Sequence, residues 1–331
     1  MKKWLLPENG KFYKANLHAH TIQSDGQNTP EEVKSIFTAK GYSVVAYTDH
    51  NVFLDRSELC DENFIALNGV ELDINGRNFG GGWLNMETCH INFIAKEQDN
   101  LDFPYYNERY LYANAPKYKD LMKSDAETVN FERKYTPECI SEMLLGGQKK
   151  GFYTVYNHPT GSLERFPIYS KYENMNAMEI YNGTWCNDSH VYDDMISLGK
   201  RIHCVGGDDS HSLGGSGFSW TMIKAEKLGY REIMQSLEAG HFYASQGPSI
   251  YELYVEDGVM HIKTSDAQAI FFSSAARSPG REYVRAQAGQ YLNQAEFKVL
   301  PECKYVRVIV VGPDGKTAST NAYYVEDLLE N

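Results

Sequence analysis

The stretch Lys14-Ala15-Asn16-Leu17-His18-Ala19-His20-Thr21-Ile22-Gln23-Ser24-Asp25-Gly26 has the pattern of a strand that ends in a polar loop. Side chains on a strand alternate between its two faces, so His18 and His20 are expected to point the same way. Neutral imidazole suits Zn, Mn, Fe or Ni, and two imidazoles at a strand end make a pair of metal ligands. The stretch alone leaves a second interpretation open, which is two partly buried histidines that bind nothing.

The residues that follow repeat the order strand, helix, strand. Thr29-Pro30-Glu31-Glu32 has the cap, the proline and the acidic first turn of a helix that should end at Gly41. The apolar run 43–47 predicts a buried strand that ends on Thr48-Asp49-His50. Further apolar runs occupy residues 63–70 before Glu71, 89–95 around His90, 151–156 before His158, 176–182, 202–207 before Asp208-Asp209-Ser210-His211, and 219–223. Strands that alternate with helices and end in polar residues predict a (β/α) barrel with its catalytic face at those ends.

Two segments depart from this rhythm. Residues 97–135 are polar and aromatic, and we expect an insertion with some helix that is either a lid or a surface excursion without function. Beyond residue 246 the helical pattern stops, and the turn signals Asp257-Gly258 and Pro313-Asp314-Gly315 predict hairpins. We therefore predict a barrel domain over residues 1–246 and a small antiparallel, sandwich-like β domain over residues 247–331.

Composition excludes several classes of protein. The 331 residues carry 44 acidic and 32 basic side chains, a net charge of −12, without the Lys/Arg stripe that an extended nucleic-acid track needs. The six cysteines show no C-x-x-C spacing, which favours thiols in a reducing compartment over a disulfide framework. No signal peptide and no apolar run of transmembrane length is seen. We expect a cytoplasmic protein without membrane or extended nucleic-acid partners, and the oligomeric state stays open.

The polar residues at the predicted strand ends form one chemical set. They include six of the ten histidines of the chain, together with four carboxylates: His18, His20, His50, His90, His158, His211, Asp25, Asp49, Glu71 and Asp209. Imidazoles and carboxylates without cysteine suit Zn, Mn or Fe in a hydrolytic centre rather than a structural zinc site. The set is too large for one ion, so two or three divalent ions are expected.

The ordered motifs H-x-H, T-D-H, G-V-E, C-H, N-H-P and G-D-D-S-H resemble those of the PHP (polymerase and histidinol phosphatase) superfamily of metallohydrolases over about residues 14–245. The resemblance implies a distorted (β/α)7 TIM-like barrel, here in the branch that carries a C-terminal β domain. It implies a first metal on His18, His20, Glu71 and Asp209, a second on Glu71, His90 and His158, and a third on Asp25, His50 and His211. Some members have histidine where Asp25 stands, so this residue departs from part of the family. Glu71, Asp209 and His211 are the expected catalytic residues.

Other candidates follow from position alone. Asp49 should face away from His50, either orienting a ligand histidine or serving as a buried structural carboxylate. Asp208 is a weaker ligand candidate than Asp209. Arg165 is the best candidate to bind a phosphate group of the substrate. The alternative is that Arg165 is a solvated surface arginine. His190, beyond a strand end, is a second candidate for a substrate contact.

The metals imply the chemistry. A water shared by two ions loses a proton near neutral pH and becomes a bridging hydroxide nucleophile. We expect a phosphoesterase acting on a small phosphomonoester, a nucleotide or an oligonucleotide end. A carbamate, ester or amide hydrolase with the same centre is the alternative, although amidohydrolases usually bridge their metals with a carboxylated lysine where this chain has Glu71. A non-catalytic metal-binding scaffold is the third hypothesis.

Overall fold

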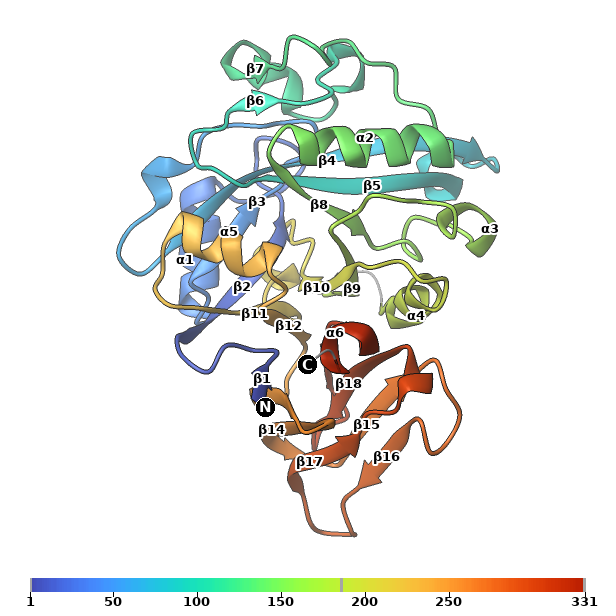
Figure 1. Cartoon of the computed structure of the whole chain (residues 1–331). Coiled ribbons are helices and arrows are strands. Elements are labelled where there is room, and N and C mark those ends of the chain that lie inside the picture. The colour runs from blue at the N-terminus through green and yellow to red at the C-terminus, as the bar shows by residue number, and fades with distance from the viewer. Residues whose placement is uncertain (1, 185–186, 330–331) are drawn as a thin grey trace.

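The computed structural model describes residues 2–184 and 187–329. Figure 1 shows a large α/β lobe, built on the first three quarters of the chain, above a smaller lobe of strands from the C-terminal part. The prediction of a mixed α/β unit followed by an antiparallel β unit is confirmed.

The large lobe is built on one mixed sheet. Its strands are, in spatial order, β10 (His203–Gly207), β9 (Ala177–Asn182), β8 (Phe152–Asn157), β5 (Met86–Ala95), β4 (Ile65–Asn78), β3 (Val44–Tyr47), β2 (Lys11–Ala19), β11 (Trp220–Ala225) and β12 (Phe242–Ser245). The pairs β10–β9, β9–β8, β4–β3 and β3–β2 are parallel. Strand β5 is antiparallel to both its neighbours, and β11 is antiparallel to β2. The architecture is therefore less regular than a uniform β/α series, because β4 and β5 form a long hairpin.

The sheet curls so that its ends meet. The amide of His20 donates to the carbonyl of Ser210 at 2.9 Å, and the amide of Ser210 donates to the carbonyl of His18 at 3.4 Å. These bonds place the residues after β10 beside the end of β2. The carboxyl ends of the parallel strands thus gather at one edge of the lobe.

Five helices of the described residues pack around the sheet, and the first of them is the helix predicted after Thr29. They are α1 (Pro30–Ala39), α2 (Pro137–Lys149), α3 (Phe166–Tyr169), α4 (Ser189–Ser197) and α5 (Tyr230–Glu238). Thr29 and Glu32 form the predicted capping box of α1, and Gly41 has a φ of +78°, a conformation that glycine adopts without strain. The hydroxyl of Thr136 caps α2 by accepting from the amide of Cys139 at 3.3 Å.

The C-terminal lobe consists of two packed sheets. One contains β1 (Lys2–Trp4), β13 (Ile250–Glu256), β14 (Val259–Ala267) and β17 (Leu292–Lys298). The other continues the large sheet from β12 through β19 (Thr317–Thr320), β18 (Tyr305–Val311), β15 (Ala269–Ser274) and β16 (Glu282–Arg285), with β20 (Tyr323–Tyr324) and α6 (Val325–Leu329) after it. The predicted hairpin at Asp257-Gly258 joins β13 and β14, and both residues have positive φ.

The chain start belongs to this second lobe. We predicted residues 1–246 as one domain, but β1 pairs with β13. Leu5 and Leu6 pack in the apolar core of the C-terminal lobe. Two apolar residues before β2 thus provide a second link between the lobes.

The segment 97–135 forms short 3-10 turns at Glu108–Tyr110 and Ala115–Leu121, with a small parallel pair of β6 (Asp102–Phe103) and β7 (Lys123–Ser124). It lies beyond β4 and β5 at the top of Figure 1. Within the described residues no helix has the length and apolarity needed to cross a bilayer. Cys60, Cys89, Cys139, Cys204 and Cys303 are free thiols, and Cys186 lies outside the described residues.

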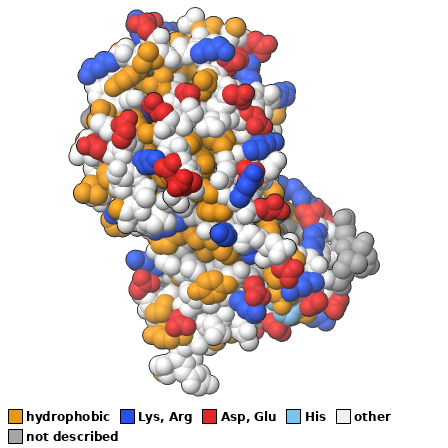
Figure 2. Space-filling view, turned by 90° about the vertical axis from the view of Figure 1, so that its left-hand side faces the viewer, with side chains coloured by type: hydrophobic (Ala, Val, Ile, Leu, Met, Phe, Trp, Pro, Cys, Tyr) orange, Lys and Arg blue, Asp and Glu red, His pale blue; other side chains and the backbone are white. Residues whose placement is uncertain are grey.

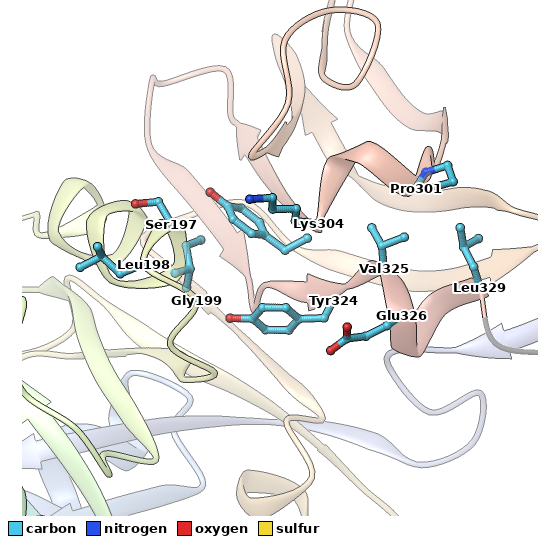
Figure 3. A pocket seen from close by; sticks show the side chains of 11 residues that line it. Ser197, Leu198, Gly199, Pro301, Lys304, Tyr324, Val325, Glu326 and Leu329 are labelled. Atoms are coloured by element: carbon cyan, nitrogen blue, oxygen red, sulfur yellow. The ribbon is translucent and has the colours of Figure 1, made fainter.

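On the face in Figure 2, Lys and Arg side chains are scattered among Asp and Glu. A groove of about 740 Å³ runs between the end of α4 and the C-terminal lobe, and Figure 3 shows Lys304, Tyr324 and Leu329 among its lining residues. None of the predicted metal ligands lines this groove.

Candidate metal centre

The curled sheet brings all nine predicted metal ligands into one cluster. Seven of them lie at or beyond strand ends, whereas Glu71 and His90 lie inside β4 and β5, because both strands are longer than their apolar runs indicate. His18 lies near the end of β2 and His20 follows it, and their ring centroids are 5.2 Å apart. Both side chains are almost completely buried. His18 and His20 therefore face one buried site, as the alternation of side chains along a strand predicts.

Glu71, in the middle of β4, is the residue around which the histidines gather. Its Oε2 lies 3.1 Å from His18 Nε2, 3.2 Å from His20 Nε2 and 3.3 Å from His50 Nδ1. Its Oε1 lies 3.1 Å from His90 Nδ1 and 3.3 Å from His158 Nε2. Each carboxylate oxygen thus faces its own group of imidazoles, the arrangement expected of a carboxylate that bridges two ions.

Asp209 closes the other side of this buried group. Its Oδ1 lies 3.0 Å from His20 Nε2 and 3.3 Å from His18 Nε2, and its Oδ2 lies 3.6 Å from His158 Nε2. Asp209 and His158 both have positive φ, at 51° and 24°. Strained backbone of this kind in residues other than glycine concentrates at functional sites, where the surroundings hold it in place.

A third group of donors lies on the open side of the cluster. Asp25 Oδ1 lies 3.3 Å from His211 Nε2 and 3.7 Å from His20 Nδ1, and Asp25 Oδ2 lies 3.9 Å from His50 Nε2. The side chains of Asp25 and His211 are about one third exposed, whereas Glu71 is buried. His20 and His50 thus face both the buried group and the open one.

The donor atoms of the cluster fit bound cations. Several are buried without a hydrogen-bond partner: His18 Nε2, both ring nitrogens of His20, His50 Nδ1, Glu71 Oε2, His158 Nε2 and Asp209 Oδ1. Buried polar atoms are normally paired, and seven unpaired ones converging on one site are accounted for by cations that they would coordinate.

The electrostatics of the site are set by the attraction between its buried carboxylates and imidazoles. Burial disfavours charge on Glu71 and Asp209, but the imidazoles around them hold the pKa of both carboxyls well below the usual range. Burial also opposes a charge on His20, yet Asp209 and Glu71 raise its pKa to about 10. Burial, with His20 nearby, lowers the pKa of His50 to about 4 despite the opposing effect of Glu71. Two buried carboxylates need positive charge beside them, which divalent ions supply.

Glu179 is a further buried carboxylate beside the cluster, and the sequence motifs do not predict it. This residue lies on β9, 2% exposed, with Oε1 3.3 Å from His18 Nδ1 and Oε2 accepting from Asn182 Nδ2 at 2.9 Å. A carboxylate on the second nitrogen of a ligand histidine sets the tautomer and the ring orientation. A charged residue inside the apolar run 177–181 was the signal that could have identified it.

Asp49, which follows β3, and Asp208, which follows β10, are both held by hydrogen bonds to neighbouring loops. Asp49 accepts from the amide of Thr21 at 2.7 Å, from the hydroxyl of Ser24 at 2.9 Å and from Arg56 at 3.1 Å. It thus holds the loop that leads to Asp25, rather than a histidine ring. Asp208 accepts from three backbone amides of residues 217–219 at 2.6–2.9 Å, and burial raises its pKa to about 6. Asp209, and not Asp208, faces the histidines.

The two predicted substrate contacts lie outside the cluster. Arg165 is 56% exposed and donates to Glu87 at 3.0 and 3.1 Å. Glu87 is three residues before His90 on β5, and residues at odd spacing on a strand point to opposite faces. His190 is exposed in the first turn of α4 and is in none of the groups of candidate ligands.

Several solved structures align with much of this chain at low sequence identity. A two-domain protein from Bacteroides vulgatus ATCC 8482, described as containing a predicted PHP-like metal-dependent phosphoesterase, aligns over 98% of both chains with 14% identity and a TM-score of 0.47. The lesion-specific endonuclease EndoQ from Pyrococcus furiosus aligns over 84% of this chain and 64% of its own, with 12% identity and a TM-score of 0.42. An amidohydrolase from Chromobacterium violaceum aligns over 69% and 96%, with 18% identity and a TM-score of 0.34.

No family model and no curated protein matches the sequence. These neighbours assign no activity to the chain.

Proposed function

We propose that this protein is a metal-dependent phosphoesterase that hydrolyses a small phosphoester, such as a phosphomonoester, a nucleotide or an oligonucleotide end. The observation that carries the proposal is Glu71, whose two oxygens each face a separate group of imidazoles. Two ions sharing such a carboxylate are the basis of hydrolysis at phosphorus without a protein nucleophile.

The residues divide between holding the ions and admitting the substrate. His18, His20, Glu71 and Asp209 would hold one ion, with Glu71 also serving a second ion on His90 and His158. Asp25, His50 and His211 would hold a third on the open side, where Asp25 and His211 reach solvent. Bound divalent ions, taken as Zn, Mn or Fe, would supply Lewis-acid activation of water and offset the charge of the phosphoryl group.

The chain contributes orientation and exclusion of water. Glu179 fixes the ring of His18, and Asp49 fixes the loop that carries Asp25. The buried side of the cluster leaves the Asp25–His211 side as the approach for substrate. Cytoplasmic location, and the expected absence of membrane or extended nucleic-acid partners, stay predictions from the sequence.

A substrate panel with Mn²⁺ or Zn²⁺ tests the proposal. It contains p-nitrophenyl phosphate, bis-p-nitrophenyl phosphate, mononucleotides and a naphthyl carbamate. Turnover of a phosphoester that is lost in Glu71→Gln supports the proposal. Turnover of the carbamate alone would replace it with the carbamate, ester or amide hydrolase, and a metal-loaded protein that turns over nothing would favour the scaffold.

A further inference from the structure

An aromatic residue of the segment 97–135 lies beside the open side of the metal centre. The ring of Tyr112 is 5.4 Å from the ring of His50, tilted by 42°, and the residue is 41% exposed. No hydrogen bond of its hydroxyl is found within the described residues. The ring of Tyr112 therefore packs beside a candidate ligand, and about two fifths of the residue stays accessible to solvent.

Two anchors hold the segment in this place. On one side, Asn114 donates through its amide to the carbonyl of Ser24 at 3.1 Å and through Nδ2 to the carbonyl of Ile22 at 2.9 Å, next to Asp25. On the other side, the buried guanidinium of Arg133 donates to Asn51 Oδ1 at 2.6 Å, next to His50.

The second anchor extends back to the same turn. The guanidinium of Arg133 lies 4.4 Å from the centre of the Tyr110 ring. The backbone amide of Arg133 donates to the Tyr110 hydroxyl at 2.9 Å. Tyr112 is thus fixed between Tyr110 and Asn114. The sequence leaves residues 97–135 open as either a lid or a surface excursion without function. Their contacts with the loops that carry Asp25 and His50 favour a segment that serves the metal centre.

The backbone next to Tyr112 is also constrained. Ala113, between Tyr112 and Asn114, has a φ of +50°, a conformation that costs free energy in a residue with a side chain and persists where the surroundings impose it. Tyr112 is thus held beside His50, at the open side of the donor cluster.

We propose that Tyr112 is a specificity residue whose ring packs against the leaving group of the substrate, so that the enzyme prefers phosphoesters with an aromatic leaving group, such as an aryl or a nucleobase-bearing group. This inference rests on the proposed phosphoesterase function. Stacking of a planar ring on an exposed aromatic side chain strengthens binding by about tenfold or more. The hydroxyl is not needed for this contact.

Binding of two phosphonates, whose P–C bond is not hydrolysed, tests the role without turnover. Isothermal titration calorimetry of the Mn²⁺-loaded full chain is expected to give about tenfold tighter binding of phenylphosphonate than of methylphosphonate. In Tyr112→Ala the preference should fall to threefold or less with methylphosphonate binding unchanged, and Tyr112→Phe should keep it. Tyr291→Ala, which removes a 56% exposed tyrosine of the C-terminal lobe, is the matched control and should keep the preference.

Each other outcome is decisive. A Tyr112→Ala variant that keeps the preference, or that loses both phosphonates equally, overturns the role in specificity. A wild-type protein that binds both phosphonates equally well overturns it too but leaves the phosphoesterase proposal standing. If neither phosphonate binds the metal-loaded wild type, the phosphoesterase proposal fails and this inference fails with it.

Discussion

Removal of the Glu179 carboxylate should weaken the first metal position without touching a ligand. In the structure this carboxylate is buried between His18 Nδ1 at 3.3 Å and Asn182 Nδ2 at 2.9 Å. Glu179→Ala frees the imidazole to rotate and removes the acceptor that keeps Nε2 available for the metal. Loss of such a partner lowers metal affinity by roughly 10–100-fold, or about 1.4–2.8 kcal/mol. Glu179→Gln keeps a neutral acceptor and should lose less.

Competition of the protein with a chromophoric Zn²⁺ chelator measures this affinity directly. Glu87→Ala is a matched control, because Glu87 is also a buried strand glutamate but pairs with the exposed Arg165. Its affinity should stay within about twofold of the wild type, since no ligand loses a partner. Equal Zn²⁺ affinity of Glu179→Ala and the wild type, or equal losses in both variants, would refute the positioning role.

Three further predictions concern other buried polar groups. Asp209→Asn should lose bound metal, whereas Asp208→Ala should keep its metal. Asp208→Ala should instead lose about 2 kcal/mol or more of unfolding free energy, because three backbone amides lose their acceptor. Metal analysis and urea unfolding distinguish the two effects, and equal metal loss in both variants would contradict the assignment of Asp209 as the ligand. Arg133→Met should speed hydrogen exchange in residues 105–133, since its bonds to the metal-centre rim are lost; unchanged exchange would contradict the anchor. Burial raises the pKa of Glu164 from 4.5 to about 7, despite the hydroxyls of three tyrosines that lower it. The contribution of Glu164 to the free energy of unfolding should therefore be highest below pH 4.5 and fall by about 3 kcal/mol as pH rises from about 4.5 to 7. In Glu164→Gln, urea unfolding at pH 5 and pH 8 should differ less than in the wild type.

Local patterns were enough to predict much of the site. The period-two alternation of a strand puts His18 and His20 on one face, and apolar runs that end in polar residues mark Glu71 and Asp209. Capping residues such as Thr29 and Thr136 mark helix starts because their side chains bond amides within the next turn. These features depend on a few neighbouring residues and are therefore readable without the fold.

Other features depended on residues distant in the chain. Glu179 lies 161 residues from His18, and its role follows only from the pairing of β9 with β10 and the closure of the sheet onto β2. The candidates Arg165 and His190 were chosen by chain proximity to strand ends, which does not specify the face to which a loop side chain turns.

The sequence by itself determined most strands of the large sheet, the donor set and the change to an antiparallel β unit near residue 246. Only the tertiary structure decided which imidazoles meet which oxygen of Glu71, that β1 joins the C-terminal lobe, and that Tyr112 lies beside His50. The physical reason is range: propensity and alternation act within a turn or a strand. The order of strands in a curled sheet, and the hydrogen bonds that anchor a distant segment to it, arise only when the whole chain packs.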